Sequence, residues 1–168
     1  MTTTKPEFIQ SKIYKCEDLQ RVIAIWKFKD RKVVFTNGCF DILHKGHVSY
    51  LAQAADLGDN LIVGLNSDAS VKKLNKGPER PIQDQDSRAL ILASLHLVSA
   101  VIIFDEETPA ELIKLVQPDV LVKGGDWKPE QIVGYDTVKA RGGEVISIDF
   151  LPGYSTTAIE QKIKSGGN

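Results

Sequence analysis

The segment Thr36-Asn-Gly-Cys-Phe-Asp-Ile-Leu-His-Lys-Gly-His47 decides the fold of this chain, and it continues the apolar run Lys32-Val-Val-Phe-Thr36. A short β-branched run that ends in Asn37-Gly38 predicts a buried strand leading into a turn. The residues that follow predict a helix that begins at the two histidines. Backbone N–H groups at a helix start lack intrahelical partners and the helix dipole is positive there, so this segment is typical of an anion-binding site.

The two histidines of this segment, His44 and His47, lie three residues apart around Gly46. Their imidazoles add hydrogen-bond donors, and the glycine lets a phosphate approach the backbone. The alternatives are one capping and one surface histidine, or a metal site, which needs a third ligand that no nearby cysteine or histidine offers. Neither a P-loop nor a G-x-G-x-x-G motif occurs, and His96 is expected at the edge of the core within a helix.

Short apolar runs alternate with helical stretches along the whole chain. The expected strands are 32–36, 61–65, 100–104, 119–123 and 144–148. The expected helices are 15–29, 48–55, 86–97 with Asp86 or Ser87 as cap, 109–116 after Thr108 as cap, 129–133, 137–141 and 155–164, with a loop at 76–81. Because the strand interiors are apolar throughout, the sequence predicts an α/β fold with one doubly wound parallel sheet of about five strands and helices on both faces.

Composition limits the class of protein. The chain has 168 residues, 42% of them hydrophobic, and a formal net charge of -1, which predicts one globular domain and argues against a nucleic-acid binder. No apolar run approaches the ~20 residues of a membrane span, and residues 1–7 lack the apolar core of a signal peptide. Cys16 and Cys39 form no metal spacing, so we expect a cytoplasmic protein that contacts no membrane.

Polar residues that follow strands are candidate site residues, because ligands of doubly wound sheets bind at the carboxyl ends of strands. Lys123 ends an apolar strand beside Gly124-Gly125, at this ligand-binding edge. The hydroxyls of Ser155-Thr-Thr157 open the last helix and are interpreted either as a cap or as donors to phosphate oxygens. The basic residues near the long loop form either a solvated face or a loop that closes over substrate: Lys72, Lys73, Lys76 and Arg80.

The histidine segment resembles the signature of the cytidylyltransferase-like nucleotidyltransferases, which share an H-x-G-H motif on a Rossmann-like fold. The resemblance covers roughly residues 32–163 and continues through Gly64-Leu-Asn-Ser-Asp-Ala-Ser70, Arg80-Pro-Ile82, Leu121-Val-Lys-Gly-Gly-Asp126 and Gly153-Tyr-Ser-Thr-Thr157. Together these segments are similar to the adenylyltransferases of ADP-heptose synthesis. Glycerol-phosphate and choline-phosphate cytidylyltransferases carry an arginine in R-T-x-G-[IV]-S-T, whereas Phe150-Leu-Pro-Gly-Tyr-Ser-Thr156 has none, which favours ATP over CTP.

The resemblance implies an enzyme that transfers AMP from ATP to a sugar 1-phosphate, most closely D-glycero-β-D-manno-heptose 1-phosphate, with Mg²⁺ as the partner of ATP. Catalytic roles are implied for His44, His47 and Lys123. The implied nucleotide-binding residues are Thr36, Asn37, Gly38, Phe40, Gly46, Gly124, Asp126, Ser155, Thr156 and Thr157. The implied substrate-binding residues are Asp41, for a sugar hydroxyl or Mg²⁺, with Asn66, Asp68, Lys72 and Arg80.

The same resemblance divides the chain into an N-terminal extension and helix at 1–31, a nucleotidyltransferase domain at 32–164 and a flexible tail at 165–168. We expect a separate sugar kinase upstream in lipopolysaccharide core synthesis, because related adenylyltransferases are often fused to one. Apolar residues of the N-terminal helix, Ile25, Trp26 and Phe28, are a candidate homodimer contact. Two other functions remain open: a cytidylyltransferase that acts on glycerol 3-phosphate or another phosphorylated acceptor, and a nucleotide-binding module without activity.

Overall fold

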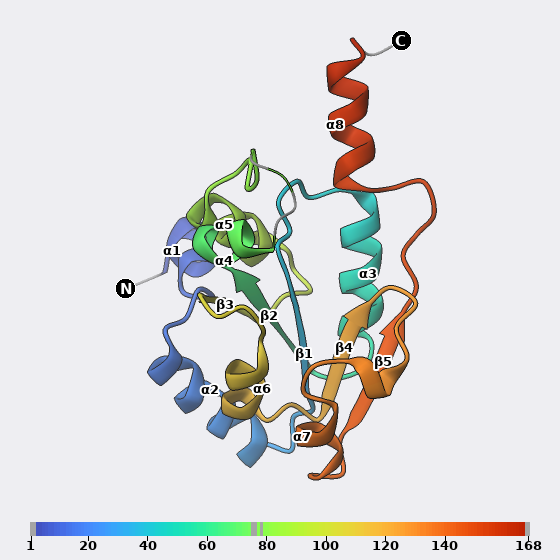
Figure 1. Ribbon diagram of the computed structural model, residues 1–168. Helices are drawn as coiled ribbons and strands as arrows, with labels where there is room; N and C mark the ends of the chain where they lie inside the picture. The colour runs from blue at the N-terminus through green and yellow to red at the C-terminus, as the bar shows by residue number, and fades with distance from the viewer. Residues whose placement is uncertain (1–2, 75–76, 78, 167–168) are drawn as a thin grey trace.

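A five-stranded, all-parallel sheet forms the centre of the molecule, with the strand order β3-β2-β1-β4-β5 (Figure 1). The computed structural model describes residues 3–74, 77 and 79–166. In chain order the elements are α1 (Lys5–Gln10), α2 (Cys16–Phe28), β1 (Val33–Gly38), α3 (Lys45–Ala55), β2 (Asn60–Asn66), α4 (Asp68–Lys73), α5 (Gln85–Ser94), β3 (Ala100–Phe104), α6 (Ala110–Val116), β4 (Val120–Gly124), the 3₁₀ helix η1 (Pro129–Gln131), α7 (Tyr135–Lys139), β5 (Glu144–Ile148) and α8 (Thr156–Lys164). The expected doubly wound α/β sheet is therefore confirmed.

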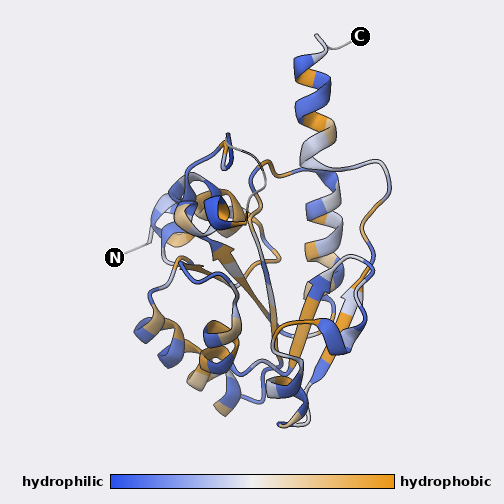
Figure 2. Ribbon diagram, in the orientation of Figure 1, coloured by the Kyte–Doolittle hydropathy of each residue, from blue (hydrophilic) through white to orange (hydrophobic). Residues whose placement is uncertain are grey.

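Both faces of the sheet are buried, because successive strand residues point to opposite sides. In β1, Val34 packs with residues of α3 and α5, whereas Val33 and Phe35 pack with residues of α2, α6 and α7 on the other face. Figure 2 shows apolar residues concentrated along the strands, with a hydrophilic tip on β4. Because both faces are buried, the strands are continuous apolar runs in the sequence and do not alternate between apolar and polar residues.

The topology places one crevice at the carboxyl ends of β1 and β4. From β1 the chain proceeds to β2 and β3 on one side, and β4 and β5 then add on the other side of β1. Such a reversal of strand order leaves a gap between the connections above the sheet, where ligands of this fold class bind. The residues at these two strand ends are Asn37-Gly38 and Lys123-Gly124.

Two helix starts differ from the sequence-based expectation. Helix α5 is capped by Asp84, whose carboxylate accepts from the Ser87 N–H at 2.8 Å and the Ser87 hydroxyl at 2.9 Å. The proposal of Asp86 or Ser87 as cap was wrong, because three residues with capping side chains stand close together here. The same helix ends at Ser94, so His96 is exposed in a turn and not within a helix at the core edge. Pro109 takes the cap position of α6, where Thr108 was expected.

The N-terminal segment packs on the sheet that the main domain forms. The N–H of Tyr14 donates to the Val101 carbonyl and the N–H of Val101 donates to the Lys12 carbonyl, both at 2.8 Å, so residues 12–14 lie along the β3 edge. Leu19 and Ile23 of α2 are buried against the sheet. A domain boundary after residue 31 stays a prediction.

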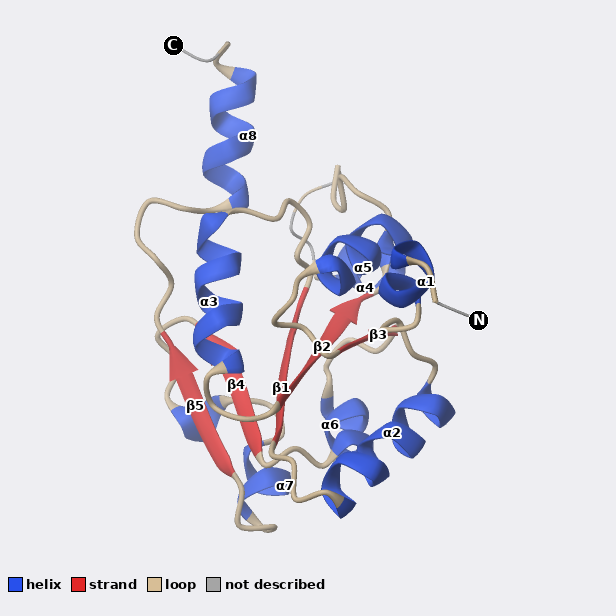
Figure 3. Ribbon diagram, turned by 180° about the vertical axis from the view of Figure 1, so that it is seen from behind, coloured by secondary structure: helices blue, strands red, loops and turns tan. Residues whose placement is uncertain are grey.

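Helix α8 stands away from the body of the protein, continuing beyond the start of α3 (Figures 1 and 3). None of its residues is buried. Of the loop expected at 76–81, Lys76 and Pro78 lie outside the described residues. Within the described ranges, no helix has the length and apolarity to cross a membrane.

Candidate active site

A cavity of about 670 Å³ opens at the carboxyl ends of β1 and β4. Its wall combines the loop after β1, the start of α3, the end of β4 and the segment that enters α8. The lining residues are Asn37, Gly38, Cys39, Phe40, Asp41, His44, Gly46, His47, Tyr50, Val71, Arg80, Lys123, Gly124, Trp127, Phe150, Tyr154, Ser155, Thr156 and Thr157. The two strand ends, two helix starts and the long loop thus meet at one place.

The histidine pair is fixed by the start of α3. His44 is the N-cap of this helix, and its Nδ1 accepts from the His47 backbone N–H at 3.4 Å. The two imidazole rings stack, with centroids 3.9 Å apart and planes inclined by 22°, and the Phe40 ring lies 5.3 Å from the His47 ring. With Nδ1 as acceptor, a neutral His44 carries its proton on Nε2 and remains a donor there.

Burial lowers the pKa of His44 below its ordinary value of 6.5. The close stacking of a second imidazole also disfavours two positive charges on the pair. Near neutral pH His44 is therefore uncharged and offers an N–H, not a full positive charge.

Gly46 lies close to two neighbouring side chains. A Cβ at this position would lie 3.0 Å from the His44 ring and 3.1 Å from the Cβ of Tyr154. Tyr154 directly precedes the cap of α8, and the Nζ of Lys45 lies 5.3 Å from the centroid of its ring. The absent side chain at Gly46 therefore lets the starts of α3 and α8 approach one another.

Lys123 is held at the end of β4 by the neighbouring strand. Its Nζ donates to the Asn37 side-chain oxygen at 3.4 Å. Behind it, Phe150 lies against Gly124, where an added Cβ would come within 2.5 Å of the ring. Trp127 similarly covers Gly125, which has a φ of 113° that favours glycine. The β4 end thus combines one cation with an aromatic wall.

The start of α8 supplies hydroxyl groups to the same cavity. Ser155 is the N-cap, and its side-chain oxygen accepts from the Ala158 N–H at 3.0 Å. The cap interpretation of Ser155 is therefore confirmed. Thr156 and Thr157 follow in the first turn and also line the cavity, so a role of this segment in phosphate binding stays a prediction.

Asp41 organises the long loop. Its carboxylate accepts from Arg80 at 2.8 Å, from the Ile82 N–H at 2.9 Å and from the Gln83 N–H at 3.0 Å. Burial alone would raise the pKa of Asp41, but the hydrogen bonds from Gln83, Ile82 and Arg80 outweigh it and lower the pKa below its ordinary value. Arg80 pairs in addition with Glu160 of α8 at 2.9 Å. Substrate binding by Asp41 and Arg80 stays a prediction.

Several residues that the sequence proposed do not line the cavity. Thr36 is buried and shares a hydrogen bond of 2.5 Å with the hydroxyl of Tyr50. Asn66 is buried and donates to the Ser70 hydroxyl at 2.9 Å. Lys72 and Asp126 are exposed outside the cavity wall. These side chains support the fold or face solvent, and a direct role in binding stays a prediction for each.

Asp68, also proposed as a substrate residue, instead pairs with Arg88 at 2.7 Å. Arg88 is fully buried, and it also donates to the carbonyls of Cys39 at 2.7 Å, Asn66 at 2.8 Å and Gln83 at 3.0 Å. Arg88 therefore links the carboxyl ends of β1 and β2 to the loop that carries Arg80 through hydrogen bonds. The Cys39 carbonyl directly precedes Phe40, whose φ of 44° is rare for a residue with a side chain.

Sequence reasoning missed the aromatic wall and Arg88. Tyr50, Trp127, Phe150 and Tyr154 all line the cavity. Burial raises the pKa of Tyr50 to about 12, so its hydroxyl stays protonated. These four aromatic residues are spread along the chain without helical or strand spacing, so no sequence pattern grouped them, although Trp127 and Phe150 each follow a strand end. Arg88 stands on the buried face of α5 beside Ala89 and Leu92, and a charged residue on an otherwise apolar face is the signal that was available.

The fold and the cavity together identify the class of enzyme to which this protein belongs. A Rossmann-like sheet with an H-x-G-H helix start, a lysine at a neighbouring strand end and a hydroxyl-rich helix start is the arrangement of a nucleotidyltransferase. Residues 35–162 match the cytidylyltransferase-like family, so the chain belongs to that family.

Individual relatives agree with this assignment. The bifunctional protein HldE of Wolinella succinogenes is 54% identical over 155 residues, which are 92% of this chain and 32% of that protein. HldE of Campylobacter concisus is 54% identical over 159 residues, or 95% of this chain and 32% of that protein. The chain thus spans about a third of the length of these curated relatives.

Two solved structures share the fold. The lipopolysaccharide core biosynthesis protein from Thermoplasma volcanium superposes with a TM-score of 0.60 at 29% identity, over 72% of this chain and 97% of that one. The pantoate-beta-alanine ligase from Francisella tularensis, complexed with beta-gamma ATP and beta-alanine, gives a TM-score of 0.59 at 18% identity, over 90% of this chain and 76% of that one. At that identity the second likeness concerns the fold alone.

Proposed function

We propose that this protein transfers AMP from ATP to a sugar 1-phosphate, releasing pyrophosphate, and that the acceptor is D-glycero-β-D-manno-heptose 1-phosphate. The observation that carries the proposal is the meeting of the stacked His44–His47 pair, Lys123 and the start of α8 around one cavity. Similarity to HldE proteins and to a lipopolysaccharide core biosynthesis protein supports the acceptor. The product then serves lipopolysaccharide core synthesis in the cytoplasm, where ATP is available.

The reaction needs positioned donors more than a base. A phosphate acceptor has a second pKa of about 6 and is already an anion at neutral pH. One of its oxygens forms a bond to the α-phosphorus of ATP, the bond from that phosphorus to the bridging oxygen breaks, and pyrophosphate leaves with the electron pair. Catalysis then consists of bringing two anions together and stabilising the charge that moves to pyrophosphate.

Each element of the cavity has a place in this scheme. The Nε2–H of His44, His47 and the start of α3 bind the phosphates at the reacting centre. Lys123, oriented by Asn37, supplies a full positive charge that the neutral His44 does not. Thr156 and the other hydroxyls of the α8 start hold the β- and γ-phosphates.

Mg²⁺ is proposed only as the counter-ion that ATP brings with it. Asp41, the carboxylate considered for a metal contact, already accepts from Arg80 and two backbone N–H groups. Within the described part of the chain, no three His, Cys, Asp or Glu side chains group to hold a metal ion. These residues do not fit a protein cage for Mg²⁺, and no step of the scheme runs through it.

The supply of the acceptor requires a separate reaction. Phosphorylation of the anomeric hydroxyl forms a sugar 1-phosphate, and we propose that a sugar kinase carries out this step before this enzyme acts. The HldE relatives are named bifunctional, and this chain covers about a third of their length. Both facts support a kinase that acts in the same series of reactions. A homodimer through the exposed Ile25 and Phe28 of α2 is a further proposal, tested by light scattering. Trp26, which was expected to join them as an exposed residue, is half-buried and packs against the core.

Pyrophosphate release tests the proposal directly. The purified protein is incubated with ATP or CTP and with heptose 1-phosphate, other sugar 1-phosphates or glycerol 3-phosphate. We expect release with ATP and heptose 1-phosphate to exceed every other pair. Greater or equal release with CTP or glycerol 3-phosphate would establish the alternative cytidylyltransferase, and ATP binding without release from any acceptor would establish a binding module.

The histidine assignment has its own test. His47→Ala removes a donor at the reacting centre and should lower kcat by roughly 10²-fold or more, by analogy with the loss of one oxyanion-type donor. The circular dichroism spectrum and the unfolding midpoint should stay close to those of the unchanged protein. Near-normal turnover in a folded His47→Ala protein would refute the role of His47 in binding the phosphates at the reacting centre.

A further inference from the structure

Helix α8 has an unusual position for an element that contributes to a site. It buries none of its residues and stands away from the body, with only its start near the cavity (Figures 1 and 3). A helix of nine residues is too short to be stable by itself in water, where about 12–15 residues are needed. Polar contacts near its start must therefore hold it in place.

One ion pair is placed to do this. The Nη2 of Arg80 lies 2.9 Å from the Oε2 of Glu160 on α8, and its Nη1 lies 2.8 Å from the Oδ2 of Asp41. The three side chains are only 12%, 22% and 4% exposed, respectively. Burial alone would lower the pKa of Arg80, but the hydrogen bonds that it donates to Asp41 and Glu160, together with their negative charges, outweigh burial and raise the pKa, so the arginine keeps its charge.

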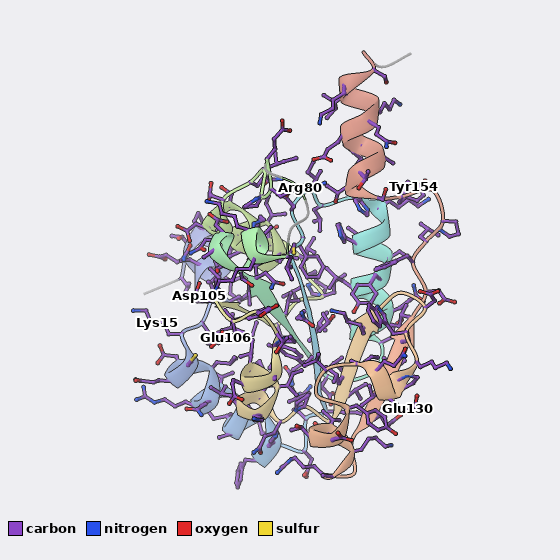
Figure 4. The ribbon with its side chains drawn as sticks, viewed as in Figure 1. Lys15, Arg80, Asp105, Glu106, Glu130 and Tyr154 are labelled. Atoms are coloured by element: carbon purple, nitrogen blue, oxygen red, sulfur yellow. The ribbon has the colours of Figure 1, made fainter. Side chains whose placement is uncertain are left out.

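The other contacts of α8 with the body are weaker. Lys164 and Glu79 are 3.7 Å apart with 70% and 78% of their side chains exposed, and such a surface pair contributes little. Tyr154 lies against Gly46 just before the helix, and it is itself 43% exposed. Figure 4 shows Arg80 and Tyr154, which both lie near the start of α8.

We propose that Glu160 is a positioning residue: by binding Arg80, which Asp41 fixes, it holds the start of α8 over the cavity. The consequence concerns the hydroxyls of Ser155, Thr156 and Thr157, which lie within one turn and a half of Glu160 on the same helix. When the ion pair is lost, α8 is released and frays, and these donors leave the cavity wall. The identity of the ligand that they bind, the phosphates of ATP, rests on the proposed function.

The ion pair also explains a coupling between distant parts of the sequence. Asp41 follows β1, Arg80 belongs to the long loop, and Glu160 belongs to α8. Because one guanidinium joins all three, the loop after β1, the long loop and α8 are held in a single arrangement. Loss of Glu160 should therefore affect ligand affinity before it affects the core.

Glu160→Gln is the test variant, and Lys164→Gln, which breaks the exposed pair on the same helix, is the matched control. Hydrogen exchange of the α8 amides is measured without ligand. We expect protection of α8 to fall about 10-fold in Glu160→Gln, the size expected for losing a charge-assisted hydrogen bond, and to change little in Lys164→Gln. The unfolding midpoint should move little, because no residue of α8 belongs to the hydrophobic core.

Kinetics separates positioning from a structural role. In Glu160→Gln we expect the KM for ATP to rise about 5- to 10-fold while kcat changes less than about 3-fold, since the histidine pair and Lys123 are untouched. In an Arg80→Gln background, Glu160→Gln should cause no further loss of α8 protection, because the two residues act through one contact.

Three results would overturn this proposal: unchanged α8 protection in Glu160→Gln, an equal loss in Lys164→Gln, or a further loss from Glu160→Gln in the Arg80→Gln background. The exchange experiment needs no substrate and so does not depend on the proposed reaction. Absence of pyrophosphate release by the unchanged protein would refute the proposed function alone.

Discussion

Replacement of Gly46 by alanine is the sharpest test of how the two helix starts meet. The added Cβ would lie 3.0 Å from the Cε1 and Nδ1 of His44 and 3.1 Å from the Cβ of Tyr154. At least one neighbour must therefore shift by a few tenths of an ångström, and both lie in the cavity wall. Gly46→Ala thus displaces the cap of α3, the entry to α8, or both.

The expected effects on stability and activity differ in size. In a helix, alanine is favoured over glycine by about 1 kcal/mol, whereas overpacking costs about 1–3 kcal/mol, so the free energy of unfolding should fall by no more than about 2 kcal/mol. A misplacement of reacting groups by about 1 Å can cost on the order of 10²-fold in rate, and the shift of a few tenths of an ångström expected here is smaller. We therefore expect kcat/KM to fall by about 10-fold, and by no more than about 10²-fold, in a protein that remains folded.

Gly64→Ala provides a matched control in the core. Its Cβ would lie 2.8 Å from the Phe35 ring and 3.1 Å from Leu112, on β2 and away from the cavity. This variant should lose about 1–3 kcal/mol of stability by overpacking and keep kcat/KM per folded molecule. Urea unfolding and the pyrophosphate assay measure the two quantities. A Gly46→Ala protein with near-normal kcat/KM would refute the close approach as a requirement for the reaction.

Three further predictions concern groups around the cavity. Because burial lowers the pKa of His44 below 6.5, the unfolded chain binds a proton more readily than the folded protein, so the free energy of unfolding should fall as the pH drops through about 6.5. In urea unfolding, His44→Asn, which keeps a capping side chain, should show a shallower dependence of this free energy on pH. Parallel pH curves for the variant and the unchanged protein would contradict the prediction. Arg88→Met should lower the free energy of unfolding by about 3–5 kcal/mol, because Asp68 and three carbonyls lose their hydrogen-bond donor. A loss below about 1 kcal/mol would contradict the role of Arg88 as a buried link between strand ends. Spectroscopic titration should find one tyrosine ionising near pH 12 that is missing in Tyr50→Phe, since burial raises its pKa to about 12.

The fold was largely accessible from the sequence because its signals are local. The strands at 100–104 and 144–148 were predicted with the bounds that they have, since each is an apolar run between residues that stop it. The cap of α5 was placed two or three residues too late because Asp84, Asp86 and Ser87 are all good capping residues, and only the hydrogen bonds that Asp84 accepts distinguish it from the others. Helix α1 was missed, although Thr4 and Glu7 form a capping box.

The residues that line the cavity were predictable where a recognisable local signal marks them, at a helix start or at a strand end such as Lys123. The histidine pair, Gly46 and the hydroxyls that begin α8 could be found because each lies at the junction of a strand or loop with a helix. Asp68 and Asn66 lie at an equally suitable strand end, yet the structure shows their side chains paired with Arg88 and Ser70. Sequence position gives the end of a strand but not the direction or the partner of a side chain.

The sequence by itself determined the parallel α/β sheet, the position of the H-x-G-H segment at a helix start and the family resemblance, because these depend on residue periodicity and on motifs within single segments. Only the tertiary structure decided that Asp41, Arg80 and Glu160 form one ion-paired group and that Arg88 is a buried link between strand ends. Asp41 and Glu160 are far apart in the chain, and a charged side chain takes its partner from whatever the fold brings within about 3 Å of it. The fold therefore determines which polar residues serve the ligand and which serve one another.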